Sequence, residues 1–163
     1  MVVRIQTADF DVGAELAALR SEQPAIGAVV SFVGLVRDIN ESAQVSALEL
    51  EHYPGMTEQS LQDILSLAAQ RWPVLRSLII HRVGPLLPLD QIVLVAVATR
   101  HRGDAFAACE FIMDYLKTRA PFWKKEQTPD GARWVDARES DELASQRWQD
   151  AAAAATLSQQ GAL

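Results

Sequence analysis

The feature that most restricts the fold is an apolar run of strand length, followed closely by a helix that ends before a proline. The run Ile92–Ala98 contains only apolar residues and predicts a strand buried on both faces of a sheet. Residues 104–119 then predict a helix with Asp104 as its N-cap. Because Pro121 disfavours the helical conformation at Ala120, the helix should end there. Its apolar face is formed by Ala105, Ala108, Cys109, Ile112 and Leu116.

The remaining patterns predict alternating helices and strands within one domain. A chain of 163 residues is long enough for a single domain with a hydrophobic core. The predicted order is α-β-β-α-β-β-α-β-α, which is typical of an α+β fold with a mostly antiparallel or mixed sheet. We expect one domain over residues 1–150 and a frayed Ala-rich tail over residues 151–163. The other predicted strands are 25–37, 45–53, 74–83 and 133–137, and the other helices begin at N-caps Asp11, Thr57 and Ser140.

A basic segment stands out in this acidic chain. The formal net charge is -6, yet residues 100–125 hold six Lys and Arg against three Asp and Glu, which gives +3 there and -9 elsewhere. Such a local cluster indicates a site for an anionic ligand rather than a surface for nucleic acid. Lys117 lies in the last turn of the predicted helix, where it complements the helix dipole in the plainest interpretation.

A catalytic interpretation of Lys117 rests on the residues after the helix. Phe122 and Trp123 come directly before Lys124 and Lys125, and large apolar groups beside two lysines predict a water-poor pocket wall. Partial desolvation would make a lysine amine usable in proton transfer.

His101 and Arg102 form a second candidate group for an anion. They come after the buried strand and before the helix, where backbone N–H groups and the helix dipole favour phosphate. A lone histidine is more often a structural, hydrogen-bonded group. We assign His52 and His81 to that structural class, because each lies inside a strand pattern.

Composition and spacing exclude several other classes. No apolar run approaches the ~20 residues that span a bilayer, and no N-terminal signal peptide is visible, so we expect a cytoplasmic protein. The single cysteine, Cys109, has no disulfide partner and is predicted to be a small core residue. The three histidines lack metal-ligand spacing, so we expect neither a metal nor a cofactor.

Several motifs of residues 25–148 resemble, in consistent order, those of the large catalytic subunits of molybdopterin synthases. They are SFVGLVRD at 31–38, LEHYPGM at 50–56, HRVG at 81–84, VAVATRHR at 95–102, MDYLKTRAPFWKKE at 113–126 and RWVDARESD at 133–141. One departure is Leu89, which stands where that family often has Gly before an acidic residue. The departure concerns the geometry of a turn and leaves the chemistry unaffected.

The resemblance implies an α/β-hammerhead fold and a homodimer within a heterotetramer. The partner would be a small ubiquitin-like subunit whose C-terminal Gly-Gly thiocarboxylate supplies sulfur, because this chain has no plausible sulfur-carrying cysteine. The reaction would convert cyclic pyranopterin monophosphate into the dithiolene of molybdopterin. Lys117 would be the main acid/base and Lys124 a second one, Arg37, His101 and Arg102 would hold the phosphate and pterin, Arg138 would reach a neighbouring subunit's pocket, and Phe32, Met113, Pro121 and Phe122 would form apolar walls.

Two alternatives remain open at this point. The chain could be a non-catalytic binding or adaptor subunit for a phosphorylated metabolite or a partner's C-terminal tail. A cyclic-phosphate hydrolase that uses His101 is a third possibility, although the sequence offers no second positioned histidine or carboxylate.

Overall fold

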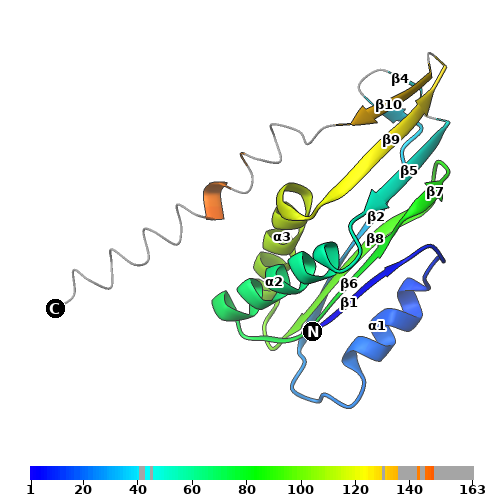
Figure 1. Ribbon diagram of the computed structural model, residues 1–163. Coiled ribbons are helices and arrows are strands. Elements are labelled where there is room, and N and C mark those ends of the chain that lie inside the picture. The colour runs from blue at the N-terminus through cyan, green and yellow to red at the C-terminus, as the bar shows by residue number, and fades with distance from the viewer. Residues whose placement is uncertain (41–42, 45, 130, 136–142, 144–145, 149–163) are drawn as a thin grey trace.

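The computed structural model contains three helices and two larger β-sheets in the part of the chain that it describes, which is residues 1–40, 43–44, 46–129, 131–135, 143 and 146–148 (Figure 1). The helices are α1 (Val12–Arg20), α2 (Met56–Arg71) and α3 (Arg102–Arg119). The strands are β1 (Val2–Gln6), β2 (Ala28–Leu35), β3 (Ile39–Asn40), β4 (Ala43–Gln44), β5 (Ala47–His52), β6 (Val74–Arg82), β7 (Gly84–Leu86), β8 (Gln91–Thr99), β9 (Phe122–Thr128) and β10 (Gly131–Val135).

The first sheet has the order β1-β6-β8-β2 and is mixed. β1 runs parallel to β6, whereas β6–β8 and β8–β2 are antiparallel. Val93 to Thr99 on β8 are all buried, so the predicted central strand is confirmed. The α+β class with a mixed sheet and flanking helices is likewise confirmed. β1 was not predicted, because five residues at a sheet edge carry too short a pattern to separate from loop.

Helices cover both faces of this sheet (Figure 1). α2 and α3 pack on one face, where their apolar residues meet Ile79, Val95 and Val97 in the largest core cluster. α1 packs on the other face, and the Asp11 side chain accepts a hydrogen bond from Ala14 N at 3.0 Å, as expected of its N-cap. The predicted apolar face of α3 is confirmed, because all five of its residues are buried.

The second sheet has the order β10-β9-β5-β7 and projects beyond the helices (Figure 1). Its inner face contributes Leu48, Leu50 and Leu86 to a small cluster that also contains Val36. The predicted strands leave Lys124 outside any element, in the loop after the 104–119 helix, and this is wrong. Lys124 is the third residue of β9, since charged residues fit a strand that belongs to a partly solvated sheet.

Two helix starts differ from the sequence prediction. α3 begins at Arg102 with His101 as its N-cap, so Asp104 lies in the first turn instead of capping the helix. α2 begins at Met56 with Gly55 as its N-cap, and the amide of Gly55 donates to the Glu58 side chain at 2.6 Å. Thr57, the predicted cap, is therefore free to make other contacts.

The backbone approaches itself closely at Gly27. A Cβ at this position would stand 2.3 Å from the carbonyl oxygen of Arg100, so only glycine fits. A β-bulge lies between Gly34 and Leu35, where the register of β2 against β8 shifts. Glycines inside a strand pattern are typical of such bulges and close approaches.

Trp148 packs against its own chain. Its ring makes edge contacts with Trp72 and Phe111, and its Nε1 donates to the Asp114 carboxylate at 2.7 Å. Ser140, the predicted cap of a last helix, Arg138 and the tail 151–163 lie outside the described residues. Across the described ranges, no helix has the length and apolar character needed to cross a membrane.

Candidate functional site at the junction of the two sheets

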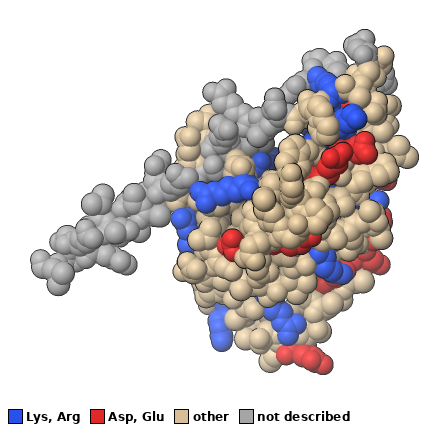
Figure 2. Space-filling model, viewed as in Figure 1, with Lys and Arg blue, Asp and Glu red and all other residues tan. Residues whose placement is uncertain are grey.

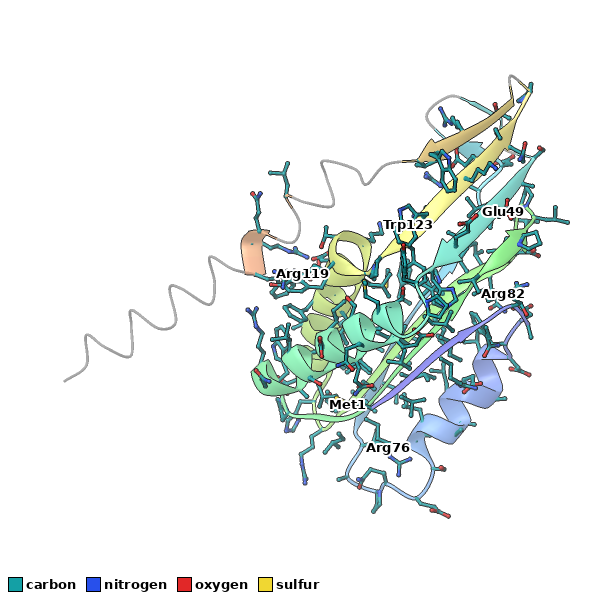
Figure 3. The ribbon with its side chains drawn as sticks, in the orientation of Figure 1. Met1, Glu49, Arg76, Arg82, Arg119 and Trp123 are labelled. Atoms are coloured by element: carbon teal, nitrogen blue, oxygen red, sulfur yellow. The ribbon has the colours of Figure 1, made fainter. Side chains whose placement is uncertain are left out.

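Lys117 and Lys124 lie on either side of one tight connection. α3 ends at Arg119, and β9 begins at Phe122, so only Ala120 and Pro121 separate the helix from the strand (Figure 3). Ala120 N donates to Leu116 O at 3.3 Å, which ends the helix where Pro121 was predicted to end it. The structure therefore keeps both lysines at the same end of α3.

The alternation of β9 separates its two lysines. Lys124 shares the inner face with Phe122 and the buried Glu126, whereas Lys125 and Trp123 point to the outer face. Trp123 makes an edge contact with Tyr53 at a ring-centroid distance of 5.0 Å, and the Lys125 amine lies 5.5 Å from the ring of Trp134. Trp123 is therefore not part of the pocket wall that the sequence suggested.

A buried, neutral histidine lies beside Lys124. His81 is 3 % exposed, and its ring stacks on Phe122 at a centroid distance of 3.8 Å. Burial lowers the pKa of His81 to about 4, against the opposing effect of the hydrogen bond between Nδ1 and Arg82 O at 2.8 Å. The positive charge of Lys124 lowers this pKa further.

Arg37 lies shortly after the last residue of β2, at one end of the first sheet. β2 runs antiparallel to β8 and ends beside Gln91, and α3 returns along the sheet from the opposite end of β8. Arg37 is exposed and comes directly after Val36, which is buried against Leu50, the residue that pairs with Lys124. Arg37 therefore lies at the end of the first sheet toward which α3 runs.

The expected apolar wall is only partly assembled. Phe32 pairs with Val95, so it lies on the face of the first sheet that packs against α2 and α3, and it is 40 % exposed. A Cβ on Gly34 would lie 3.3 Å from the ring of Phe32, so glycine leaves room for this ring beside the bulge. Side chains of a regular strand alternate between the two faces of the sheet, but the bulge between Gly34 and Leu35 interrupts this alternation. The number of residues from Phe32 to Arg37 therefore does not tell whether the two side chains lie on the same face. Met113 is buried in the main core cluster against which Phe122 packs.

His101 and Arg102 lie at the opposite end of α3. Fifteen residues separate Arg102 from Lys117, so about 22 Å of helix lies between them at 1.5 Å per residue. Both residues are exposed, and Thr99 Oγ1 donates to the His101 carbonyl at 2.7 Å. Within one chain, the predicted phosphate-binding residues therefore form two groups instead of one.

Three residues of the junction escaped the sequence analysis. The sequence predicts Thr57 as a helix cap and His81 as an ordinary structural histidine, and it gives no expectation for Ser60. Thr57 donates to the carbonyl of Pro121, and Ser60 donates to that of Arg119. Only the register of distant strands brings these groups together, so no local pattern could have indicated them.

The fold and this junction define an α+β protein with two exposed lysines on either side of the connection between α3 and β9. The basic residues on the face in Figure 2 are scattered among neutral and acidic ones, which fits a local site better than a broad polyanion surface. Among the described residues, no group of His, Cys, Asp and Glu has the geometry to hold a metal ion.

Comparison with known proteins gives the family. The model of the MoaE protein family matches residues 5–119. A molybdopterin synthase catalytic subunit from Ralstonia nicotianae is 66% identical over 157 residues, which cover 94% of this chain and 89% of the relative. One from Escherichia coli is 57% identical over 139 residues, which cover 85% and 92%. The chain therefore belongs to the MoaE protein family, and the function that this membership gives it is that of a molybdopterin synthase catalytic subunit in molybdenum cofactor biosynthesis.

Solved structures agree with this membership. The molybdopterin biosynthesis MoaE protein from Burkholderia ambifaria has a TM-score of 0.79 at 63% identity, with 91% of this chain and 97% of that chain covered. Molybdopterin synthase from Staphylococcus aureus has a TM-score of 0.76 at 34% identity, with 82% and 96% covered. A molybdopterin-converting factor structure from Helicobacter pylori shares the fold, with a TM-score of 0.69 at 22% identity and 85% and 92% covered. The sequence-based family assignment and the enzyme class are confirmed.

Proposed function

We propose that Lys117 and Lys124 are the acid/base residues of a sulfur transfer from a thiocarboxylate to cyclic pyranopterin monophosphate. The observation that carries this proposal is their placement on either side of the α3–β9 connection, with Lys124 on the inner face beside a neutral His81. A neutral imidazole leaves the neighbouring amine without a second fixed positive charge. The arrangement thus suits groups that must both neutralise an anion and exchange a proton.

The proposed chemistry begins with a C–S bond. The thiocarboxylate sulfur of the partner's tail attacks a substrate carbon that bears oxygen, so that a C–S bond forms as a C–O bond breaks, and an amine protonates the oxygen that leaves. Water then attacks the acyl carbon, the acyl–sulfur bond breaks, and the tail leaves as a carboxylate while the sulfur stays on the substrate. Repetition with a second thiocarboxylate completes the dithiolene.

The sulfur donor is proposed to be a small ubiquitin-like subunit with a C-terminal Gly-Gly thiocarboxylate. The Helicobacter pylori neighbour is described as a complex of subunits 1 and 2 of molybdopterin-converting factor, which supports a second, smaller subunit. Lys117 and Lys124 are exposed in the single chain. A bound tail would therefore supply the exclusion of water that the amines need.

We also propose a homodimer whose two copies each bind one small subunit, which gives a heterotetramer. Arg37 lies toward the C-terminal end of α3, whereas His101 and Arg102 lie at the other end, about 22 Å of helix away. A second copy that presents its own His101–Arg102 end, together with Arg138, would complete the phosphate and pterin site. Phe32, Met113 and Pro121 would line its apolar side. We place this assembly in the cytoplasm, with residues 1–150 as one catalytic domain.

The rival function is that of a subunit that binds the phosphorylated metabolite or the tail without catalysis. A pure binder needs positive charge, whereas a catalyst needs an amine that gives up its proton. The two functions therefore differ in their tolerance of arginine at position 117.

The deciding experiment is single-turnover conversion of cyclic pyranopterin monophosphate with thiocarboxylated small subunit. Lys117→Ala should lower product formation by a factor of roughly 100 or more, the usual scale for a positioned acid/base group. Lys117→Arg should fail nearly as badly, because guanidinium keeps its proton at neutral pH. A well-folded Lys117→Arg variant with near wild-type turnover would favour the binding subunit.

Lys124 and Lys125 offer a matched pair for the same assay. They are adjacent on β9 but point to opposite faces. Lys124→Ala should lower turnover strongly, and Lys125→Ala should leave it close to wild type. Equal effects of the two substitutions would argue against a specific role for Lys124.

A further inference from the structure

The connection between α3 and β9 interrupts a strand ladder. β5 and β9 pair antiparallel as far as His52 opposite Phe122, so the next pair would be Tyr53 and Pro121. Pro121 has no N–H to donate, and the ladder cannot continue. Both backbone groups of Tyr53 turn to Thr57 instead. Tyr53 N donates to Thr57 Oγ1 at 3.0 Å, and Thr57 N donates to Tyr53 O at 2.9 Å.

The same hydroxyl also binds the other side of the interrupted ladder. Thr57 Oγ1 donates to Pro121 O at 3.1 Å, so its single proton and one lone pair are both used. Thr57 is 0 % exposed, and water therefore has no access to replace the hydroxyl. One residue of α2 thus bridges the end of β5 and the start of β9.

A second residue of α2 holds the other end of the connection. Ser60 lies one turn after Thr57, and its Oγ donates to Arg119 O at 3.2 Å. Arg119 is the last residue of α3 (Figure 3). Its guanidinium lies over the ring of Tyr115, 4.0 Å from the ring centroid. α2 therefore fixes the backbone at both ends of the link from Lys117 to Lys124.

We propose that Thr57 is a positioning residue for the sulfur-transfer site, with Ser60 as its supplement. The proposal rests on the proposed roles of Lys117 and Lys124. Lys117 moves with α3 and Lys124 with β9, and the short connection between them sets their relative position. Thr57 touches neither substrate nor amine, and it acts by holding Pro121.

Thr57→Val is the direct substitution, because valine keeps the branched shape and removes only the hydroxyl. Tyr53 N and Pro121 O then lose their partner, and the connection must shift to satisfy them. A small misplacement of reacting groups is costly, so the single-turnover rate should fall about tenfold or more. The substrate dissociation constant should change little. Thr57→Ser restores the hydroxyl and should restore the rate.

Thr118→Val is the matched control. Thr118 Oγ1 donates to Asp114 O at 2.9 Å within α3, so this substitution also removes a threonine hydroxyl, one residue from Lys117, without touching the connection. Its rate should stay near wild type. Ser60→Ala is a milder test of the same connection, since alanine is a good helix former, and it should lower the rate by at least about twofold.

Both Thr57 and Ser60 variants are also measured in a Lys117→Ala background. If Thr57 positions Lys117, Thr57→Val should lower the single-turnover rate little further when Lys117 is already alanine. A general loss of stability would lower the rate by the same factor in the wild-type and the Lys117→Ala backgrounds. A wild-type rate in folded Thr57→Val, with Lys117→Ala impaired, would overturn the proposal for Thr57 alone. Should Thr57→Val not fold, a wild-type rate in Ser60→Ala would overturn it. A wild-type rate in Lys117→Ala would instead overturn the proposed function.

Discussion

His81 couples the stability of the fold to pH. Its pKa is lowered to about 4 in the folded chain, against an ordinary value of 6.5, mainly because the ring is buried. The unfolded chain therefore binds the extra proton between these pH values, and stability falls as pH drops from 6.5 to 4. The full effect corresponds to about 3 kcal/mol at 1.36 kcal/mol per pKa unit.

The measurement is urea denaturation at several pH values between 7 and 4, with His81→Gln for comparison. The wild type should lose stability steadily over this range, and His81→Gln should lose less. A wild type and variant with the same pH slope would contradict the assignment of the slope to His81.

Among the described residues, Arg37 is the predicted phosphate ligand that lies toward the Lys117 end of α3, and we expect Arg37→Ala to weaken substrate binding. Loss of a charge-assisted contact to phosphate costs on the order of 1.5–3 kcal/mol. Isothermal titration with cyclic pyranopterin monophosphate measures this directly. Arg20→Ala, in the exposed last turn of α1, is the charge-matched control and should bind normally. An unchanged dissociation constant in Arg37→Ala would remove Arg37 from the site.

At the scale of elements, the turn before β8 shows how one departure from a family pattern is accommodated. Asp90 N donates to Leu87 O at 3.0 Å, with Pro88 and Leu89 between them. Leu89 has φ 75°, which matches the third position of a type II turn, where glycine is favoured. Leu89 N donates to Val36 O at 2.9 Å, and the Asp90 side chain accepts from Leu87 N at 2.8 Å. These contacts hold Leu89 in a left-handed conformation.

Leu89→Gly should therefore stabilise the protein. The left-handed conformation costs a side-chain-bearing residue about 1–2 kcal/mol, and the greater freedom of glycine in the unfolded chain offsets part of the gain. Since the Leu89 side chain is 81 % exposed, little packing is lost. Thermal denaturation should show a net gain of about 0.5–1 kcal/mol. Leu87→Gly, which removes a neighbouring exposed leucine without a positive φ, should give no gain, and equal gains would contradict the explanation.

At the scale of the whole molecule, the exposed apolar surface available to a second copy does not include Trp148, because its ring packs against Trp72 and Phe111. Large apolar side chains stand exposed on the outer face of the second sheet, where Trp123 and Trp134 lie. Exposed apolar residues that gather on one face are typical of interaction sites.

We expect a homodimer in solution. Sedimentation equilibrium at micromolar concentration should give twice the monomer mass, 17.9 kDa, for the chain without its small partner subunit. The same measurement on Trp148→Ala should also give a dimer. The Trp148 ring packs inside its own chain, so its loss should affect stability more than association. A stable monomer of the wild-type chain would contradict the homodimer and the two-copy site.

Local sequence determined a large part of this protein. The buried run of β8, the apolar face of α3 and the end of α3 before Pro121 follow from side-chain pattern and from proline geometry, which act over a few residues. The sequence also selected Lys117, Lys124 and Arg37 as site residues, and their roles stay predictions. The motifs that identify the family are likewise legible without a structure.

Only the tertiary structure decided where β9 lies and how Thr57 acts. β9 is a strand because β5, about seventy residues earlier, pairs with it, and strand formation depends on such distant partners more than on intrinsic preference. The same pairing turns Trp123 outward, Lys124 inward and Pro121 toward Thr57. The Thr57 hydroxyl on α2 then accepts from Tyr53 N and donates to Pro121 O where the ladder stops, and no pattern local to either segment encodes that contact.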